Sequence, residues 1–220
     1  YENGVLSSAS TSAVFPPSDA VKHSSYRVVV TPDDGTGSGP TGEATLTVSN
    51  ADPSLTGPTL SASSVTVGDV LTCAASATDV DGDSVTLTYT WSDGSTGTTY
   101  AVTDADDPGD AITCTVVADD GDGGTATASA SASVDNTDPV LTGVTVDPST
   151  AQVGDLLTCS GTATDADGGT PSLSYAWSGG GSGSTYTVVD TDDPGDVITC
   201  TMTATDTDGG SATGSATASI

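Results

Sequence analysis

Clustered aspartates are the residues of this chain whose type and spacing could do chemistry. The 220 residues include 30 Asp or Glu against two Lys or Arg and one His, a formal net charge of −28. Glu occurs only as Glu2 and Glu43. Because the short Asp side chain holds its carboxylate close to the backbone, dense Asp loops are typical of sites that wrap hard cations, as well as of turns. Calcium binding is the candidate chemistry, and solvated turns capped by Asp remain the alternative.

The acidic loops belong to a unit that repeats every 86 residues. A loop and three marker residues show the register: Asp107-Pro108-Gly109-Asp110 returns as Asp193-Pro194-Gly195-Asp196, and Cys73, Trp91 and Cys114 return as Cys159, Trp177 and Cys200. The register predicts one complete domain over 52–136 and another over 137–220. Tandem copies of a small domain usually work by length and surface rather than through one pocket.

Residues 1–51 align with the later half of a copy, the part after its third strand. We therefore expect the chain to be a piece of a longer protein. The alternative is that a neighbouring subunit supplies the missing strands. Neither a signal peptide nor a transmembrane run is recognisable, so we expect no direct membrane insertion.

The four cysteines, two in each complete copy, predict one disulfide per copy. Each bridge would close a loop of about 40 residues and stabilise its domain by roughly 4 kcal/mol. Such a staple suits a thin core, because the chain is only 34% hydrophobic and 4% aromatic. Disulfides indicate an oxidising, extracytoplasmic setting. Free thiols are the alternative, and zinc is disfavoured because both complete copies lack His and CxxC spacing.

The strand pattern of one copy is a period-two alternation, and no segment has a helical period. Four inward-facing rows are expected: Leu71, Cys73, Ala75 and Ala77; Val85, Leu87, Tyr89 and Trp91; Ile112, Cys114, Val116 and Ala118; Ala126, Ala128, Ala130, Ala132 and Val134. With shorter strands near 58–66 and 97–103, about seven strands per copy predict an all-β, two-sheet sandwich.

The order Cys–Trp–Cys, with Val67-Gly68-Asp69 and Tyr89-Thr90-Trp91, resembles the bacterial immunoglobulin-like repeats, similar to PKD and cadherin-like repeats, of long secreted or surface proteins. The resemblance implies tandem immunoglobulin-like β-sandwich domains. It also implies a disulfide between strands B and F of each complete domain, with Trp91 and Trp177 as core residues packed on it. Two departures from the family pattern stand out. The tyrosine-corner position holds Ile112 and Ile198 in the complete copies, and only the partial copy has Tyr there, at Tyr26. The partial copy has Val28 where Cys114 would fall, so it should have no B–F bridge.

In that fold the B–C and F–G loops lie at the end where the chain enters, and the E–F loop lies at the opposite end. Carboxylates of successive copies should therefore converge at the joints and bind cations, with Ca²⁺ expected as the cofactor. The candidate ligands at the joint between complete copies are Asp104, Asp106, Asp107, Asp135, Asp138, Asp165, Asp167, Asp206 and Asp208. Those near the first joint are Asp52, Asp79, Asp81, Asp83, Asp120 and Asp122.

Two features of the sequence limit this calcium prediction. An EF-hand is excluded, because position 12 counted from Asp79 is Thr90 rather than Glu. The first joint should bind metal more weakly, or bend, because its E–F loop, 16–20, has the single carboxylate Asp19.

The net charge makes nucleic acid and anionic membranes poor partners. Catalysis is not expected, since His23, the sole His, is interpreted as a surface residue and no triad can be assembled. The expected function is a structural segment of an extracellular bacterial surface fibre, filament or stalk, rigidified by disulfides and by calcium at domain junctions. Expected partners are further copies of the repeat, as in a homopolymer, and O-glycans on Ser/Thr. The alternative is an adhesin-type module that recognises glycan or protein through its loop faces.

Overall fold

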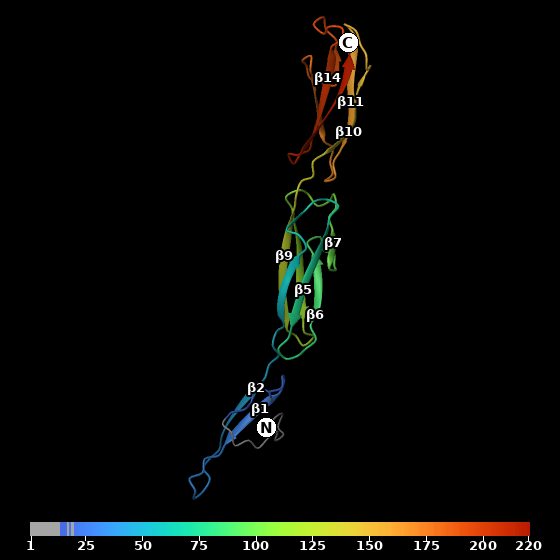
Figure 1. Ribbon diagram of the computed structural model, residues 1–220. Coiled ribbons are helices and arrows are strands. Elements are labelled where there is room, and N and C mark those ends of the chain that lie inside the picture. The colour runs from blue at the N-terminus through green and yellow to red at the C-terminus, as the bar shows by residue number, and fades with distance from the viewer. Residues whose placement is uncertain (1–13, 17, 19) are drawn as a thin grey trace. The chain divides into compact units, whose positions relative to one another are not determined.

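The computed structural model describes residues 14–16, 18 and 20–220. Its regular elements are all strands (Figure 1). They are β1 (Ser25–Val30), β2 (Gly42–Thr47), β3 (Ser54–Leu60), β4 (Ser64–Val65), β5 (Val70–Thr78), β6 (Thr86–Trp91), β7 (Thr99–Ala101), β8 (Ala111–Asp119), β9 (Thr125–Val134), β10 (Val140–Asp147), β11 (Leu156–Thr164), β12 (Ser172–Trp177), β13 (Thr185–Thr187), β14 (Val197–Thr205) and β15 (Ser211–Ser219). No helix in the described part of the chain has the length and apolar character needed to span a bilayer.

We number the partial copy, 1–51, and the complete copies, 52–136 and 137–220, as the first, second and third domains. The third domain is built from two antiparallel sheets of three strands, ordered β10-β11-β13 and β12-β14-β15. In immunoglobulin terms these are A-B-E and C-F-G. Residues 197–205 of β14 pair with residues 211–219 of β15 without a register break. On the other side of β14, Trp177 of β12 lies opposite Cys200. This register places the Trp beside the bridging Cys, as the predicted Cys–Trp–Cys order requires.

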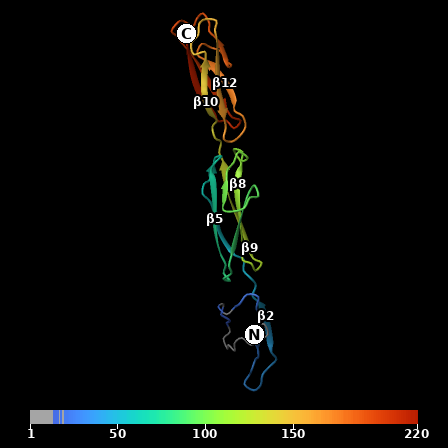
Figure 2. The ribbon, with the colours of Figure 1, turned by 90° about the vertical axis from the view of Figure 1, so that its right-hand side faces the viewer.

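The second domain repeats this plan with one more short strand. Its sheets are ordered β3-β5-β7 and β4-β9-β8-β6, and β5, β8 and β9 can be followed in Figure 2. The added strand β4 runs parallel to β9, with Val65 opposite Val134. In the third domain a parallel bridge between Thr150 and Ser219 marks the same place. The seven strands of this domain confirm the number that the alternation predicts.

The predicted inward rows form the cores. Side chains along β5 and β9 alternate between buried or half-buried and exposed, whereas those along β8 alternate between buried and half-buried. Leu71, Cys114 and Val116 are fully buried. Leu71, Ile112, Leu157 and Met202 are the largest fully buried side chains, and the disulfides and aromatic pairs pack with them. In the third domain Trp177 packs on Tyr186 with ring centroids 5.5 Å apart, and its indole Nε1 donates to the Gly183 carbonyl at 3.0 Å.

Each sandwich is closed by one disulfide between its B and F strands. Cys73 pairs with Cys114 and Cys159 with Cys200, each over a sequence separation of 41 residues. No free cysteine remains. The strand order, the B–F bridges and the Trp on strand C confirm an all-β chain of tandem immunoglobulin-like sandwich domains, with one disulfide in each of the two complete ones.

The partial copy contributes a hairpin, β1 paired antiparallel with β2, from Ser25 opposite Thr47 to Val30 opposite Gly42. These strands correspond to F and G. The tyrosine corner expected at Tyr26 is present, because the Val21 amide donates to the Tyr26 hydroxyl oxygen at 2.9 Å. Residues 1–13, the start of the segment that aligns with the part of a copy after its third strand, lie outside the described residues, as do Pro17 and Asp19 of the E–F loop.

In the complete domains a Tyr on strand E, rather than one on strand F, forms a hydrogen bond to the E–F turn. The Tyr186 hydroxyl, on β13, donates to Asp192 Oδ2 at 2.9 Å, and Tyr100 donates to Asp106 Oδ1 at 2.7 Å. Asp192 is buried, and Oδ2 also accepts from the Val189 amide at 2.8 Å. Burial, together with the Asp192 carboxylate, raises the pKa of Tyr186, so the hydroxyl stays a donor at neutral pH.

Tyr186→Phe is therefore expected to lower the free energy of unfolding of the third domain by about 1–3 kcal/mol, because a buried carboxylate loses a hydrogen-bond donor. Urea denaturation followed by tryptophan fluorescence measures the change. Tyr175→Phe is the matched control, since this half-buried Tyr on β12 makes no hydroxyl hydrogen bond to another described residue. Equal losses in both variants would count against a special role for the Tyr–Asp pair.

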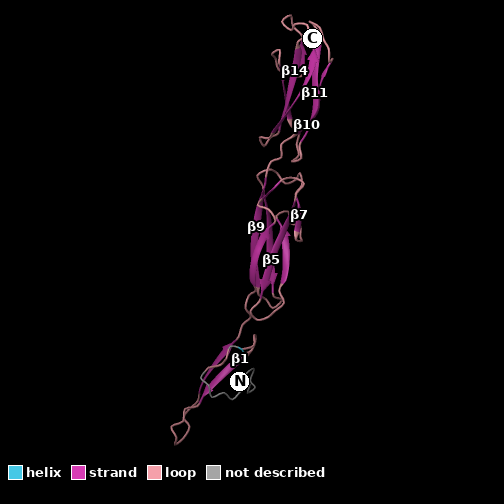
Figure 3. Ribbon diagram, viewed as in Figure 1, coloured by secondary structure: helices cyan, strands magenta, loops and turns pink. Residues whose placement is uncertain are grey.

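By its internal contacts the chain divides into two compact units. The first comprises Tyr1–Pro58, Ala74–Thr90 and Thr115–Ser129, and the second comprises Thr59–Cys73, Trp91–Cys114 and Ala130–Ile220. Their boundary crosses the second sandwich. The domain limits 1–51, 52–136 and 137–220 remain predictions from the repeat. Figure 3 shows that long loops join the strands at the ends of each sandwich, and these loops carry the candidate site.

Candidate functional site

Three segments meet at one end of each complete domain, which we call its entry end: the linker, the B–C loop and the F–G loop. For the third domain they are 136–138, 165–169 and 206–210. Local hydrogen bonds build the loops, because each leading Asp accepts from amides two to four residues later. Asp165 Oδ1 accepts from the Asp167 amide at 2.9 Å, and Asp206 Oδ1 accepts from the amides of 208, 209 and 210 at 2.7–2.9 Å.

The linker of the third domain connects these two loops. The Asn136 side-chain amide donates to Asp206 Oδ2 at 3.1 Å, and the Thr137 backbone amide donates to Asp167 Oδ2. Burial alone would raise the pKa of Asp206, but the bonds from Asn136 and the loop amides outweigh it, and the pKa lies below its ordinary value. Asp206 is therefore an ionised residue that organises the loop.

Four oxygen atoms at this entry end are buried without a hydrogen-bond partner. They are Asn136 Oδ1, Thr137 Oγ1, Asp165 Oδ2 and Asp167 Oδ1. The most enclosed side chain is Asp167, which is only 8% exposed. A buried carboxylate oxygen without a partner is costly. Carboxylate, amide and hydroxyl oxygens are the donor set of calcium, so these residues fit a bound divalent ion.

The E–F loop of the second domain lies against this entry end, as the sequence predicts. A Cβ placed on Gly168 would lie 3.7 Å from the Asp104 carbonyl oxygen. Asp107 and Pro108 share an open hollow with residues of the B–C and F–G loops, namely Asp167, Gly168, Gly169, Thr207 and Asp208. The predicted convergence of Asp107, Asp167 and Asp208 is thus observed.

Other predicted ligands are engaged elsewhere. Both oxygens of Asp106 accept hydrogen bonds inside its own E–F loop, from the Tyr100 hydroxyl and the Thr103 amide. Asp135 Oδ1 accepts from the Ser133 hydroxyl at 3.4 Å. Asp138 Oδ1 lies beside Gly210, 2.6 Å from where a Cβ would be, as does Asn136 Nδ2. Asp138 is therefore at the entry end, whereas Asp106 is part of the E–F turn.

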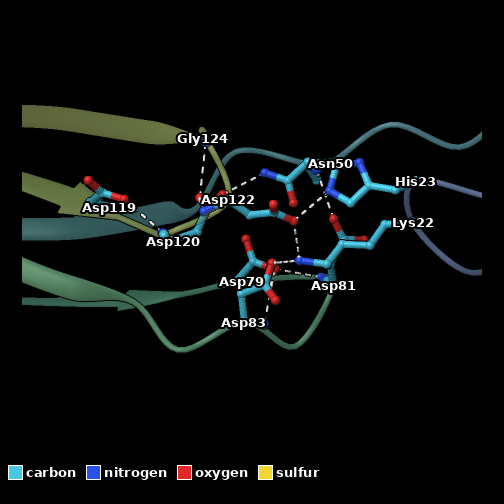
Figure 4. Close-up of polar contacts among 12 residues, drawn as sticks. Lys22, His23, Asn50, Asp79, Asp81, Asp83, Asp119, Asp120, Asp122 and Gly124 are labelled. Carbon is cyan, nitrogen blue, oxygen red and sulfur yellow. Dashed lines mark hydrogen bonds and ion pairs between the residues drawn. The ribbon is translucent and has the colours of Figure 1, made fainter.

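The entry end of the second domain comprises 50–52, 79–83 and 119–124 (Figure 4). Asp79, Asp83 and Asp120 form the one acidic group, among described residues, whose oxygens lie within 4.8 Å of one another. The third domain cannot repeat this group, because the position that corresponds to Asp83 is Gly169. Asn50 Oδ1 and Asp79 Oδ2 are buried without partners, so this end repeats the pattern of unpaired oxygens.

The remaining predicted residues here hold the linker and the F–G loop. Asp81 Oδ2 accepts from the Ala51 amide at 2.8 Å. Asp120 Oδ2 accepts from the Asn50 side-chain amide at 2.7 Å, and its Oδ1 accepts from the amides of Asp122 and Gly124. These bonds, led by the Asp122 amide, lower the pKa of Asp120. The backbone of Asp52 lies against the F–G loop, because a Cβ placed on Gly124 would be 3.0 Å from the Asp52 Cα.

Two basic residues that the sequence analysis did not assign to the site complete it. Lys22 Nζ pairs with Asp83 and, at 2.7 Å, with Asp122, while His23 Nε2 lies 2.7 Å from Asp122 Oδ2. The two partners, Lys22 first, lower the pKa of Asp122, and Asp122 and Asp83 raise that of Lys22. The repeat could have indicated both residues, because it aligns Lys22 and His23 with Pro108 and Gly109 of the turn that faces the next entry end.

No protein-family model matches the chain, and no curated protein sequence matches it. Among solved structures it is similar to the N-terminal eight Ig domains of Down Syndrome Cell Adhesion Molecule: 15% identity, 94% of this chain and 29% of that one covered, TM-score 0.43. It is similar to Sidekick-1 immunoglobulin domains 1–4 at 17% identity, covering 94% and 59%, TM-score 0.40. Fibronectin(III)-like modules of Clostridium thermocellum CbhA match at 16%, covering 76% and 93%, TM-score 0.30. The immunoglobulin-like assignment rests on this chain's own strand order and disulfides.

Proposed function

We propose that the chain is a structural segment of an extracellular bacterial surface fibre, filament or stalk, in which calcium ions at domain junctions stiffen a string of disulfide-bonded sandwiches. The observation that carries the proposal is the set of buried, unpaired oxygens at the entry end of the third domain, led by Asp167 Oδ1. They adjoin the hollow that the preceding E–F loop lines. An ion bound there would join two successive domains.

Three further features support this role. The two B–F disulfides are typical of secreted proteins, which points to an extracellular location. The 86-residue repeat places Asp-rich loops at the same end of successive domains, as expected of a structural array. Calcium is a suitable ion because it accepts six to eight oxygen ligands in irregular geometry, which loops can provide.

Backbone ¹⁵N relaxation of the intact chain, with calcium and with a chelator, tests the proposal. In calcium the second and third domains should tumble with one common correlation time, and after chelation they should show separate, shorter ones. Potassium chloride at matched ionic strength controls for general screening of the acidic surface. Correlation times that do not respond to calcium would contradict a stiffening role for the ion.

A further inference from the structure

Lys22 has no basic counterpart in the complete copies of the repeat. Its ammonium group lies between Asp83 of the B–C loop and Asp122 of the F–G loop (Figure 4). The side chains of Lys22 and Asp83 are 24% and 21% exposed, so the contact is partly shielded from solvent. All of these residues belong to the first compact unit. The ammonium thus lies among the carboxylates of the entry end.

The carboxylate that Lys22 binds belongs to the group with metal-binding spacing. Asp83 shares that group with Asp79 and Asp120. A lysine ammonium and a divalent cation are both held by charge and by oxygen contacts. Because Asp83 cannot be fully available to both, a bound ammonium should weaken metal binding at this end.

The repeat shows that the turn carrying Lys22 is otherwise unchanged. The register lays Lys22 on Pro108 and His23 on Gly109. The backbone bond is the same in both turns: the His23 amide donates to the Val48 carbonyl and the Gly109 amide to the Val134 carbonyl, each at 2.8 Å. His23 also keeps the left-handed backbone of the glycine, with φ 61° against 93°. A non-glycine residue adopts this conformation at some cost, so the two turns differ mainly in side-chain charge.

We propose that Lys22 is a built-in counter-cation that fills the entry end of the second domain, where a divalent cation binds once the lysine is removed. His23 adds a second contact to Asp122. The third domain faces Pro108 instead and depends on an ion from solution. Only the statement about the third domain rests on the proposed calcium-dependent function. The role of Lys22 at the second domain can be tested separately.

Calorimetric titration of the full chain with calcium chloride tests this assignment. Wild type should bind one ion, and Lys22→Ala should bind two. Arg27→Ala is the matched control, because it removes the same charge from β1, where Arg27 pairs with Glu43 at 3.3 Å, and should leave one site. If Lys22→Ala matches Arg27→Ala in number and affinity of sites, the inference is overturned.

The titration also separates the two proposals. If wild type binds no calcium and Lys22→Ala binds one ion, the counter-cation role of Lys22 is supported and calcium binding at the third domain is contradicted. Thermal melting gives a second readout. In chelator, Lys22→Ala should melt at a lower temperature than Arg27→Ala, because Asp83 and Asp122 lose their counter-charge. Calcium should then raise the melting temperature of Lys22→Ala and reduce this difference. Equal melting of the two variants in chelator would contradict the proposed role of Lys22.

Discussion

Replacing Cys159 and Cys200 together by Ser is expected to cost the third domain about 4 kcal/mol of unfolding free energy, by the loop-entropy estimate for a bridge of this span. The bridge closes a sequence separation of 41 residues, and both sulfurs lie in the core beside Trp177 and Leu157. With few large aliphatic side chains around it, the core has little to offset the loss. For a domain of this size the midpoint should fall by roughly 15–30 °C.

Differential scanning calorimetry of the intact chain measures the effect, because the second domain keeps its own bridge. The pair Cys73→Ser and Cys114→Ser should produce a loss of similar size in the second domain, since its bridge has the same separation. A loss below about 1 kcal/mol in both double variants would mean that the sheets are stable without their staples, against the thin-core argument.

Calcium is expected to raise the melting temperature of the third domain, and Asp167→Asn to abolish that response. At a calcium concentration of 100 times the dissociation constant the stabilisation is about 2.7 kcal/mol, equivalent to roughly 10–20 °C. In chelator the effect of the mutation on the melting temperature should have the opposite sign. Asp167→Asn should then melt above wild type, because it removes an unpaired buried charge among acidic neighbours.

Asp193→Asn is the control for this experiment. It makes the same charge change in the same domain, at an exposed site in the E–F turn rather than at the entry end. It should leave the calcium response intact. A calcium response that survives in Asp167→Asn, or one lost equally in Asp193→Asn, would show that the ion acts through general screening rather than at the assigned oxygens.

The sequence predicts the sandwiches well because period-two alternation and the Cys–Trp–Cys order constrain them locally. Leu71, Cys73 and Trp91 are buried as the alternation requires, and the bridges join the expected strands. The fold rule then places the E–F loop against the next entry end, as Asp104 beside Gly168 shows. These predictions hold because each rests on a pattern repeated twice in one chain.

The roles of individual residues at the junctions were less predictable. Asp106 is taken up by Tyr100, six residues away, a pairing that the repeated Tyr–Asp spacing could have suggested. Lys22 and His23 contact Asp122, which is about a hundred residues away along the chain, so no local sequence pattern indicates these contacts. The first junction, expected to bind metal more weakly or to bend because its E–F loop has one carboxylate, has Lys22 against Asp83 of the acidic group of Asp79, Asp83 and Asp120. The contacts of Lys22 and His23, unlike the Tyr100–Asp106 pair, depend on tertiary placement rather than on local spacing.

A crystal structure of the chain grown in calcium, with anomalous scattering to identify the ion, tests the central claim most directly. We expect one calcium at the entry end of the third domain, about 2.3–2.6 Å from Asp165 Oδ2, Asp167 Oδ1 and Asn136 Oδ1. We expect the Lys22 ammonium, not a metal, beside Asp83 and Asp122. Ordered water without an ion at the first position, or calcium displacing Lys22 at the second, would contradict these expectations.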